Sequence, residues 1–168
     1  MTDLSVNKLI QQLTAELAPL FSSTDQPVIV GIETGGYLIA KALYDNLNPD
    51  TELGKLNITF YRDDFTKTGL HPTVKPSNLP SDIDGKTIIL VDDVLYSGRT
   101  VRAAMNELFD YGRPDKILLA ILIDRGGREL PIQADYVGQT IDLAEDEQIK
   151  LSGQDSLNLR IQKNKITQ

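Results

Sequence analysis

Three short apolar runs, rich in branched residues, limit the folds open to this chain more than any other feature. They are PVIVGI at 27–32, KTIILVDDV at 86–94 and KILLAILID at 116–124. Within the apolar part of each run, residues on both alternating faces are hydrophobic, as in strands of a parallel sheet buried between two layers of helices. Amphipathic helical patterns separate the runs. The sequence therefore predicts an α/β fold with a central parallel sheet flanked by helices.

Three helices are predicted, near the amino terminus, after residue 34 and after residue 99. Gly112 is expected to cap the last of them. Two further strands are predicted, LNITFYR at 56–62 and a short one near ADYVG, before an irregular acidic tail whose RIQKNK is a frayed end. The helical residues expected to face the core are Val6, Leu9, Ile10, Leu13, Leu17, Leu38, Ile39, Ala42, Leu43, Leu47, Val101, Ala104, Met105, Leu108 and Phe109.

Length and composition narrow the class of protein. A length of 168 residues predicts one domain, 1–168, with its own core. The amino-terminal sequence lacks a signal-peptide pattern and the longest apolar run, ILLAILI, is too short for a bilayer, so a cytoplasmic protein without a membrane partner is expected. The chain has no cysteine and a net charge of −7, which disfavours thiolate metal sites and lowers the expectation of nucleic-acid binding.

The stretch VDDVLYSGRT at 91–100 carries the clearest chemistry. Adjacent carboxylates, Asp92 and Asp93, follow an apolar strand, and a small-residue turn leads from them into a helix. Gly98 lets the backbone approach a ligand closely, and the first amides of the helix offer an anion site. The alternative interpretation is a solvated turn followed by an ordinary helix cap.

A phosphate site beside two carboxylates suits a ribose 5-phosphate. Two adjacent ribose hydroxyls donate hydrogen bonds that the carboxylates accept. Mg²⁺ near Asp92 and Asp93 would relieve the repulsion between them. The turn lacks the lysine of a nucleoside-triphosphate loop, so a triphosphate is not implied.

The string TIILVDDVLYSGRTVRAAMNEL resembles the phosphoribosyl diphosphate (PRPP) signature of type I phosphoribosyltransferases. It is most similar to the version in the PyrR family, pyrimidine-operon attenuators with uracil phosphoribosyltransferase activity. VGIETGG, ITFYRDDFTK, LFDYGRPDKI and DRGGRELPIQADYVG also match that family in order, over roughly residues 5–150. The resemblance implies the type I fold, with a small hood and a flexible lid loop. It also implies Mg²⁺-dependent reaction of PRPP with uracil to give UMP and pyrophosphate, in a homodimer or higher homo-oligomer.

The resemblance also implies roles for individual residues. Asp92 and Asp93 would hold the ribose hydroxyls and share Mg²⁺ with PRPP. Arg62 and Asp63 would act in catalysis. They lie in Tyr61–Asp64, which leads into the lid, residues 63–78. The remaining PRPP contacts would be Thr34, Gly35, Gly36, Tyr96, Ser97, Gly98, Arg99 and Thr100. The base contacts would be Asp124, Arg125, Tyr136 and Val137; the last two also match the base-stacking position of purine phosphoribosyltransferases.

Five positions depart from the family pattern because a basic residue or histidine is replaced. They are Glu33, Gly35, Gly127, Gln133 and Gln139. Each change can remove a phosphate contact. The sequence therefore predicts a retained PRPP site with weak or absent RNA binding, unless other surface lysines form an RNA face.

Two further functions remain open beside the uracil enzyme. One is an RNA-binding attenuator that senses uridine nucleotides in the same pocket. The other is a catalytically weak nucleotide sensor that binds a protein partner. The Arg62–Asp63–Asp64 sequence of the lid favours catalysis over the sensor. His71, the only histidine, is interpreted as a solvated loop residue.

Overall fold

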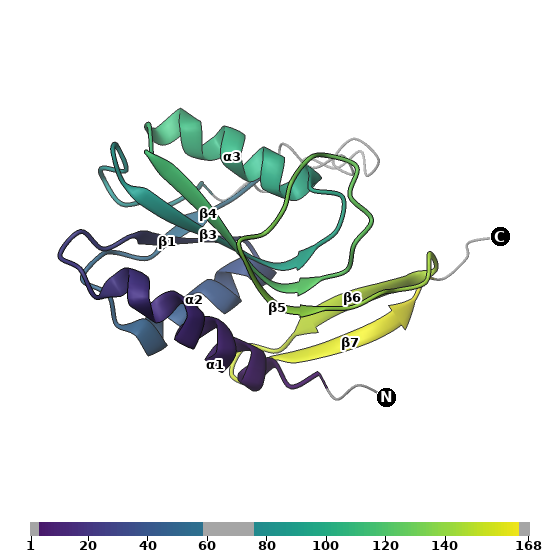
Figure 1. Ribbon diagram of the computed structural model, residues 1–168. Coiled ribbons are helices and arrows are strands. Elements are labelled where there is room, and N and C mark those ends of the chain that lie inside the picture. Colours follow the sequence, from purple (N-terminus) through teal and green to yellow (C-terminus); the bar gives the residue numbers. More distant parts are fainter. Residues whose placement is uncertain (1–3, 59–75, 165–168) are drawn as a thin grey trace.

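A parallel sheet forms the centre of the molecule. The computed structural model describes residues 4–58 and 76–164 (Figure 1). The sheet has five strands in the order β2-β1-β3-β4-β5, all parallel. A separate antiparallel hairpin pairs β6 with β7. The elements are α1 Val6–Leu17, a 3-10 turn Ala18–Phe21, β1 Val28–Ile32, α2 Gly35–Leu47, β2 Gly54–Leu56, β3 Thr87–Leu95, α3 Arg99–Tyr111, β4 Lys116–Asp124, β5 Tyr136–Thr140, β6 Glu147–Ser152 and β7 Asn158–Lys163.

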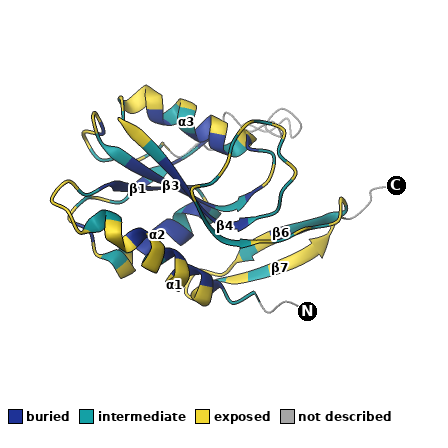
Figure 2. Cartoon of the chain, viewed as in Figure 1, coloured by how far each residue is buried: buried dark blue, intermediate teal, exposed yellow. Residues whose placement is uncertain are grey.

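Helices cover both faces of the sheet, as predicted. In Figure 1, α1 and α2 lie below the sheet and α3 lies above it. Alternate residues of β3 serve the two layers, because Ile89 and Val91 pack with α1 and α2 whereas Ile88 and Leu90 pack with α3. This alternation explains why the strands lack a polar face. Figure 2 shows the resulting buried layer running through β1, β3 and β4.

The predicted inward face of α1 is confirmed at every position. Its five predicted apolar residues are all buried, and Leu13 and Leu17 are completely inaccessible. Burying one such leucine side chain stabilises a fold by about 1.5–3 kcal/mol. The apolar stripe, rather than a cap, therefore holds this helix, since no side chain caps its amino end.

Helix α3 departs from the prediction at two residues. Phe109 was expected to face the core but is 47% exposed, and Ala103 is buried in addition to Val101, Ala104 and Leu108. Gly112 is the C-cap, as predicted, but its backbone is extended, φ 166°, rather than left-handed. Glycine is suited to this position because a Cβ would lie 2.7 Å from Asp84 Oδ1.

Two strand predictions are also corrected. The strand expected at 56–62 is β2, Gly54–Leu56, and residues 59–62 lie outside the described part of the chain. The tail expected to be irregular contains β6 and β7, so residues 160–163 of the predicted frayed end form part of a strand. Ile149 anchors this hairpin in the core layer of α1 and α2. The hairpin forms a small second sheet next to the strand ends in Figure 1.

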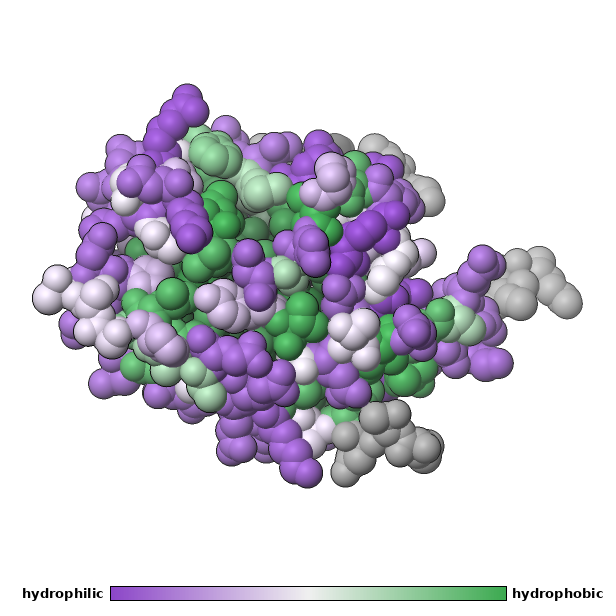
Figure 3. All heavy atoms as spheres, viewed as in Figure 1, coloured by the Kyte–Doolittle hydropathy of each residue, from purple (hydrophilic) through white to green (hydrophobic). Residues whose placement is uncertain are grey.

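One face of the molecule is mainly polar. On the face drawn in Figure 3, hydrophilic side chains predominate, and apolar ones show between α1 and α3. No helix in the described ranges is both long and apolar enough for a membrane crossing.

Candidate active site

The strand order creates a crevice between β1 and β3. These strands are neighbours, but the chain leaves β1 for α2 on one face and leaves β3 for α3 on the other. In open α/β sheets such a reversal of direction separates the two following helices and leaves a ligand site at the carboxyl ends of the strands. The two motifs selected from the sequence, ETGG and DDVLYSGRT, lie at these two strand ends.

The acid pair lies inside the last part of β3. Asp92 is the only charged residue in the buried set of the described chain, at 6% exposure. Asp92 Oδ1 accepts a hydrogen bond from the Asp93 amide at 2.9 Å, and Asp93 Oδ1 accepts one from the Val94 amide at 3.0 Å. Backbone amides thus offset part of the repulsion between the two carboxylates.

The amino end of α2 contacts this pair through two glycines. A Cβ on Gly35 would overlap the Asp93 carboxylate, and a Cβ on Gly36 would lie 2.5 Å from the Val91 carbonyl oxygen. No side chain caps α2, whose first amides have no partner within the helix. Thr34, at the N-cap, follows a cis peptide bond from Glu33. The positive end of the α2 dipole therefore lies against Asp92 and Asp93.

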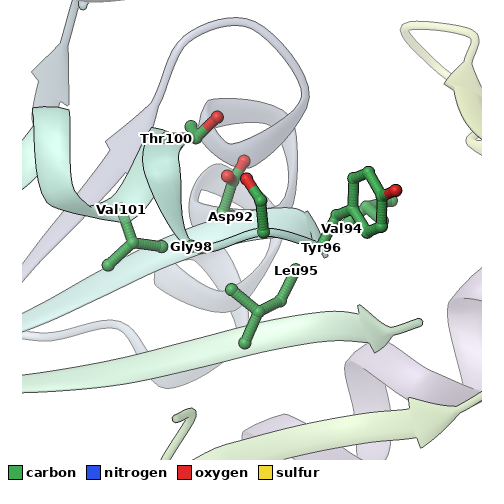
Figure 4. Close-up of a pocket in the computed structure, with 8 residues that line it drawn as sticks. Asp92, Val94, Leu95, Tyr96, Gly98, Thr100 and Val101 are labelled. Atoms are coloured by element: carbon green, nitrogen blue, oxygen red, sulfur yellow. The ribbon is translucent and has the colours of Figure 1, made fainter. Parts of the chain in front are cut away.

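A second helix end lies on the other side of the acids. Ser97 Oγ accepts a hydrogen bond from the Arg99 amide at 3.2 Å, and Gly98 has φ 90°, a left-handed conformation that suits glycine. Figure 4 shows the Asp92 carboxylate and the Thr100 hydroxyl on the same side of this turn, with the Tyr96 ring pointing away. The Asp92 and Thr100 side chains both line a cavity of about 100 Å³. Its other lining residues are Val94, Leu95, Tyr96, Ser97, Gly98 and Val101.

Two carboxylates between two helix amino ends form a site with defined chemistry. Each helix end favours an anion, whereas Asp92 and Asp93 favour hydroxyl donors or a cation. A ligand that carries phosphate at both ends of a ribose would place one phosphate at each helix end. Its ribose hydroxyls would then meet the acid pair. Of the predicted residues, Gly35 and Gly36 therefore lie against the acid pair. Asp92 lines one cavity with Tyr96, Ser97, Gly98 and Thr100.

Arg99, a predicted phosphate contact, forms an ion pair in this structure. Its Nε lies 2.8 Å from Glu129 Oε2, and both side chains are about half exposed. A phosphate at the loop would compete with Glu129 for the guanidinium. An exposed pair of this kind contributes about 0–1 kcal/mol, so such competition is weak.

Asp124 and Arg125 lie at the end of β4, beside the acid-pair strand. Leu95 pairs with Asp124 in the parallel register. Burial alone would raise the pKa of Asp124, but hydrogen bonds from Arg128 and the Gly126 amide, with the charge of Arg128, hold that pKa below its ordinary value. The Arg125 guanidinium lies 4.0 Å from the centre of the Tyr96 ring, and its buried Nε has no hydrogen-bond partner.

The structure does not bring Tyr136 and Val137 to this edge. They begin β5 and pair with Ala120 and Ile121, whereas Thr140 is the partner of Asp124. Four residues of strand separate Tyr136 from Thr140, about 13 Å. Tyr136 packs instead against the core layer of α1 and α2. The base-stacking role of these two residues stays a prediction from the resemblance.

Arg128 is a residue that the sequence reasoning missed. Its Nη2 lies 2.6 Å from Asp124 Oδ2, its Nη1 donates to the Tyr96 carbonyl at 2.9 Å, and its Nε donates to the Ile132 carbonyl at 2.8 Å. The only sequence signal was its place in GGREL beside the predicted base residues. Arg62 and Asp63, with the rest of 59–75, lie outside the described residues.

The residues present fit a magnesium ion that arrives with a phosphorylated ligand. Within 4–58 and 76–164, no three His, Cys, Asp or Glu side chains are grouped as an all-protein metal site. Mg²⁺ commonly uses one or two carboxylates together with substrate phosphates and water. Asp92 and Asp93 provide such carboxylates at the crevice.

Most of the departures from the family pattern lie near this crevice. Gly35 contacts Asp93, and Gly127 contacts the Tyr96 ring. Glu33 lies 3.9 Å from Lys55 of β2, and Gln139 pairs with Ile123 one residue before the end of β4. Gln133 is exposed. Gly35 and Gly127 therefore lie against predicted site residues, and Glu33 directly precedes Thr34.

Comparison with known proteins agrees with this fold. The family model described as "Phosphoribosyl transferase domain" matches residues 4–153. Solved structures with the same fold include a hypoxanthine-guanine phosphoribosyltransferase from Bacillus anthracis, with a TM-score of 0.65 and 22% identity over 82% of this chain and 79% of that one. A hypoxanthine phosphoribosyltransferase from Staphylococcus aureus has a TM-score of 0.64 and 22% identity over 86% and 76%.

Curated relatives are much closer in sequence. The "Bifunctional protein PyrR" of Nitrosococcus oceani is 52% identical over 164 residues, 95% of this chain and 92% of that protein. The proteins of the same name from Pseudomonas savastanoi and Pseudomonas aeruginosa are 51% and 53% identical, over 92% and 87% of this chain and 92% and 85% of those proteins. The chain is therefore a phosphoribosyltransferase of the type I fold and belongs to the PyrR family.

Proposed function

We propose that this protein transfers the phosphoribosyl group of PRPP to uracil, giving UMP and pyrophosphate. The observation that carries the proposal is the acid pair of β3 between the amino ends of α2 and α3. In this assignment, the amides of Gly35 and Gly36 receive the pyrophosphate, Asp92 and Asp93 hold the ribose hydroxyls, and residues 96–100 bind the 5-phosphate. The protein is proposed to act as one domain.

The bond change needs no protein nucleophile. The uracil N1 forms a bond to the anomeric carbon while the bond from that carbon to pyrophosphate breaks, and the proton of N1 is lost. Catalysis then consists of aligning base and ribose and of stabilising the charge of the leaving group. When bound, Mg²⁺ supplies charge neutralisation on the pyrophosphate. The α2 amino end adds fixed dipoles at the same place.

The proposed base side lies at the end of β4. Arg125 offers a buried Nε that lacks a partner, and a carbonyl oxygen of uracil would accept its hydrogen bond. Both Asp124 carboxylate oxygens accept hydrogen bonds, from the Gly126 amide and from Arg128. Asp124 is therefore assigned to stabilising the loop after β4 rather than to contacting the base. Membership of the PyrR family supports uracil over purines. The roles of Arg62 and Asp63 stay predictions from the resemblance.

The test mixes the protein with PRPP, Mg²⁺ and each of uracil, hypoxanthine, guanine and orotate, and follows nucleotide monophosphates by chromatography. UMP alone is the expected product. Asp93→Asn should lower kcat/KM by about a hundredfold, since it removes a charge at the reacting ribose. Arg113→Gln, an exposed change at the opposite end of β4, is the matched control. A purine nucleotide as the main product would overturn the assignment of uracil.

A second activity deserves a separate test because the relatives are named bifunctional. We propose that binding of pyrimidine-operon leader RNA is weak in this chain, given its net charge of −7 and its five changed positions. Lys150 and Arg160 are paired across the β6–β7 hairpin and form a basic surface. If the chain does bind RNA, this surface is the candidate contact. Tight, sequence-specific gel shifts at about 0.15 M salt would overturn the proposal of weak binding. A cytoplasmic location and a homo-oligomer stay predictions.

A further inference from the structure

The loop after β4 is joined to the phosphate-binding turn by several backbone hydrogen bonds. We call residues 125–132 the base loop and residues 95–99 the phosphate loop. The Arg125 amide donates to the Leu95 carbonyl at 3.1 Å. The Glu129 and Leu130 amides both donate to the Ser97 carbonyl, at 3.0 and 3.1 Å. Two loops that would contact different parts of a substrate therefore share one hydrogen-bonded framework.

Arg128 spans this framework with all three nitrogens of its guanidinium. It contacts the phosphate loop at the Tyr96 carbonyl, the end of β4 at Asp124, and the end of the base loop at the Ile132 carbonyl. Its side chain is only 24% exposed. The planar fork of arginine can reach three acceptors in fixed directions, whereas a lysine ammonium cannot reproduce that geometry.

The Tyr96 ring adds a side-chain contact between the same loops. The Arg125 guanidinium covers one part of the ring, at 4.0 Å from its centre. A Cβ on Gly127 would overlap the ring, and Gly127 has φ 80°, where other residues are strained. Gly98 of the phosphate loop lies similarly close to Ile132, with 3.0 Å between a Cβ at position 98 and Ile132 Cγ1. The two loops are therefore in close side-chain contact as well as hydrogen-bonded to each other.

We infer that Arg128 is a positioning residue that fixes the base loop on the phosphate loop. PRPP bound at the phosphate loop would then order Arg125 and its neighbours before the base arrives. Without Arg128, the loops keep their backbone bonds and the contacts of Tyr96 and Gly98, but they lose the side chain that joins Tyr96, Asp124 and Ile132. The backbone bonds at exposed Glu129 and its neighbour Leu130 should then open more often. The inference rests on the proposed function for its kinetic consequence, but the linkage of the loops can be measured without turnover.

The experiment measures amide hydrogen exchange in the wild type, Arg128→Gln and Arg128→Lys, each with and without PRPP and Mg²⁺. In the wild type, PRPP should slow exchange at the Glu129 and Leu130 amides as well as in the phosphate loop. In Arg128→Gln, base-loop exchange should be about tenfold faster, and PRPP should slow only the phosphate loop. Arg128→Lys should lie between them, and Arg113→Gln should match the wild type.

Kinetics provide a second readout that a purely structural role would not give. In Arg128→Gln, the KM for uracil should rise about tenfold, while the calorimetric Kd of PRPP stays within about threefold. Unchanged exchange in a folded variant, or loss of PRPP affinity as large as the rise in KM, would overturn the inference. A wild type that makes no UMP but shows the expected exchange would overturn the uracil assignment alone.

Discussion

Two adjacent glycines differ in what a methyl group would meet. A Cβ at Gly35 would overlap the end of the short Asp93 side chain, whereas a Cβ at Gly36 would lie 2.5 Å from a carbonyl oxygen of β3. A side chain can turn aside, but the backbone of a central strand cannot. The same chemical change should therefore affect activity at one position and stability at the next.

Gly35→Ala is expected to displace the Asp93 carboxylate and to lower kcat/KM for PRPP by about tenfold. Its stability should change little, because alanine also favours the first helical turn. Gly36→Ala should instead lower the free energy of unfolding by about 1–3 kcal/mol through overpacking. Steady-state kinetics and urea unfolding of both variants check this. Equal effects of the two changes on both quantities would contradict the geometry.

Asp124 gives a pH-dependent prediction. Since its pKa in the folded protein is held below the ordinary value of 3.8, its carboxylate stabilises the fold above that pH. This contribution is lost as pH falls through the folded pKa. Asp124→Asn should therefore be less stable than the wild type at pH 7, and the difference should shrink below about pH 4. Thermal unfolding between pH 7 and 3 measures it, and a difference that grows on acidification would refute it.

At the scale of residues, the sequence points to candidate site residues where the chemistry is local. Asp92, Asp93 and residues 96–100 could be selected because strand, acids, turn and helix follow one another. Arg128 and Glu129 were missed as partners because their contacts, Tyr96 and Arg99, lie 32 and 30 residues away. No spacing rule connects positions that only the sheet brings together.

At the scale of elements, α3 shows how a helical pattern can mislead. Leu108 is completely buried and its neighbour Phe109 is 47% exposed, although both are large and apolar. Helical periodicity allows either residue at the edge of the stripe to face the core. The position of the neighbouring sheet decides between them. The tail was misjudged for a similar reason, because β6 and β7 need each other and the core contact of Ile149 to form.

The two neighbours on α3 form a matched pair for mutation. Leu108→Ala should lower the free energy of unfolding by about 2–5 kcal/mol, since it leaves a cavity in the layer between α3 and the sheet. Phe109→Ala should cost about 1 kcal/mol or less, because much of its ring already contacts water. Chemical denaturation of both variants checks the difference. Similar losses for both would show that Phe109 is buried in solution.

At the scale of the whole molecule, ligand binding should be visible as stability. PRPP with Mg²⁺ at about a hundred times its Kd should add about 2.7 kcal/mol. For a chain of 168 residues, this corresponds to a rise in Tm of about 5–10 °C. Chelation of Mg²⁺ with EDTA should remove most of the rise, and Asp93→Asn should reduce it. An equal rise with and without EDTA would contradict the proposed role of the acid pair.

The sequence by itself determined the α/β class, the parallel sheet and the strand–acid pair–turn–helix motif, because period, apolar runs and turn chemistry are local properties of the chain. Only the tertiary structure decided the contacts across the crevice. It placed the α2 glycines against the acid pair, joined Arg128 to both loops, and paired Tyr136 with Ala120 in the sheet. These features depend on strand register and helix placement, which arise from packing between distant segments.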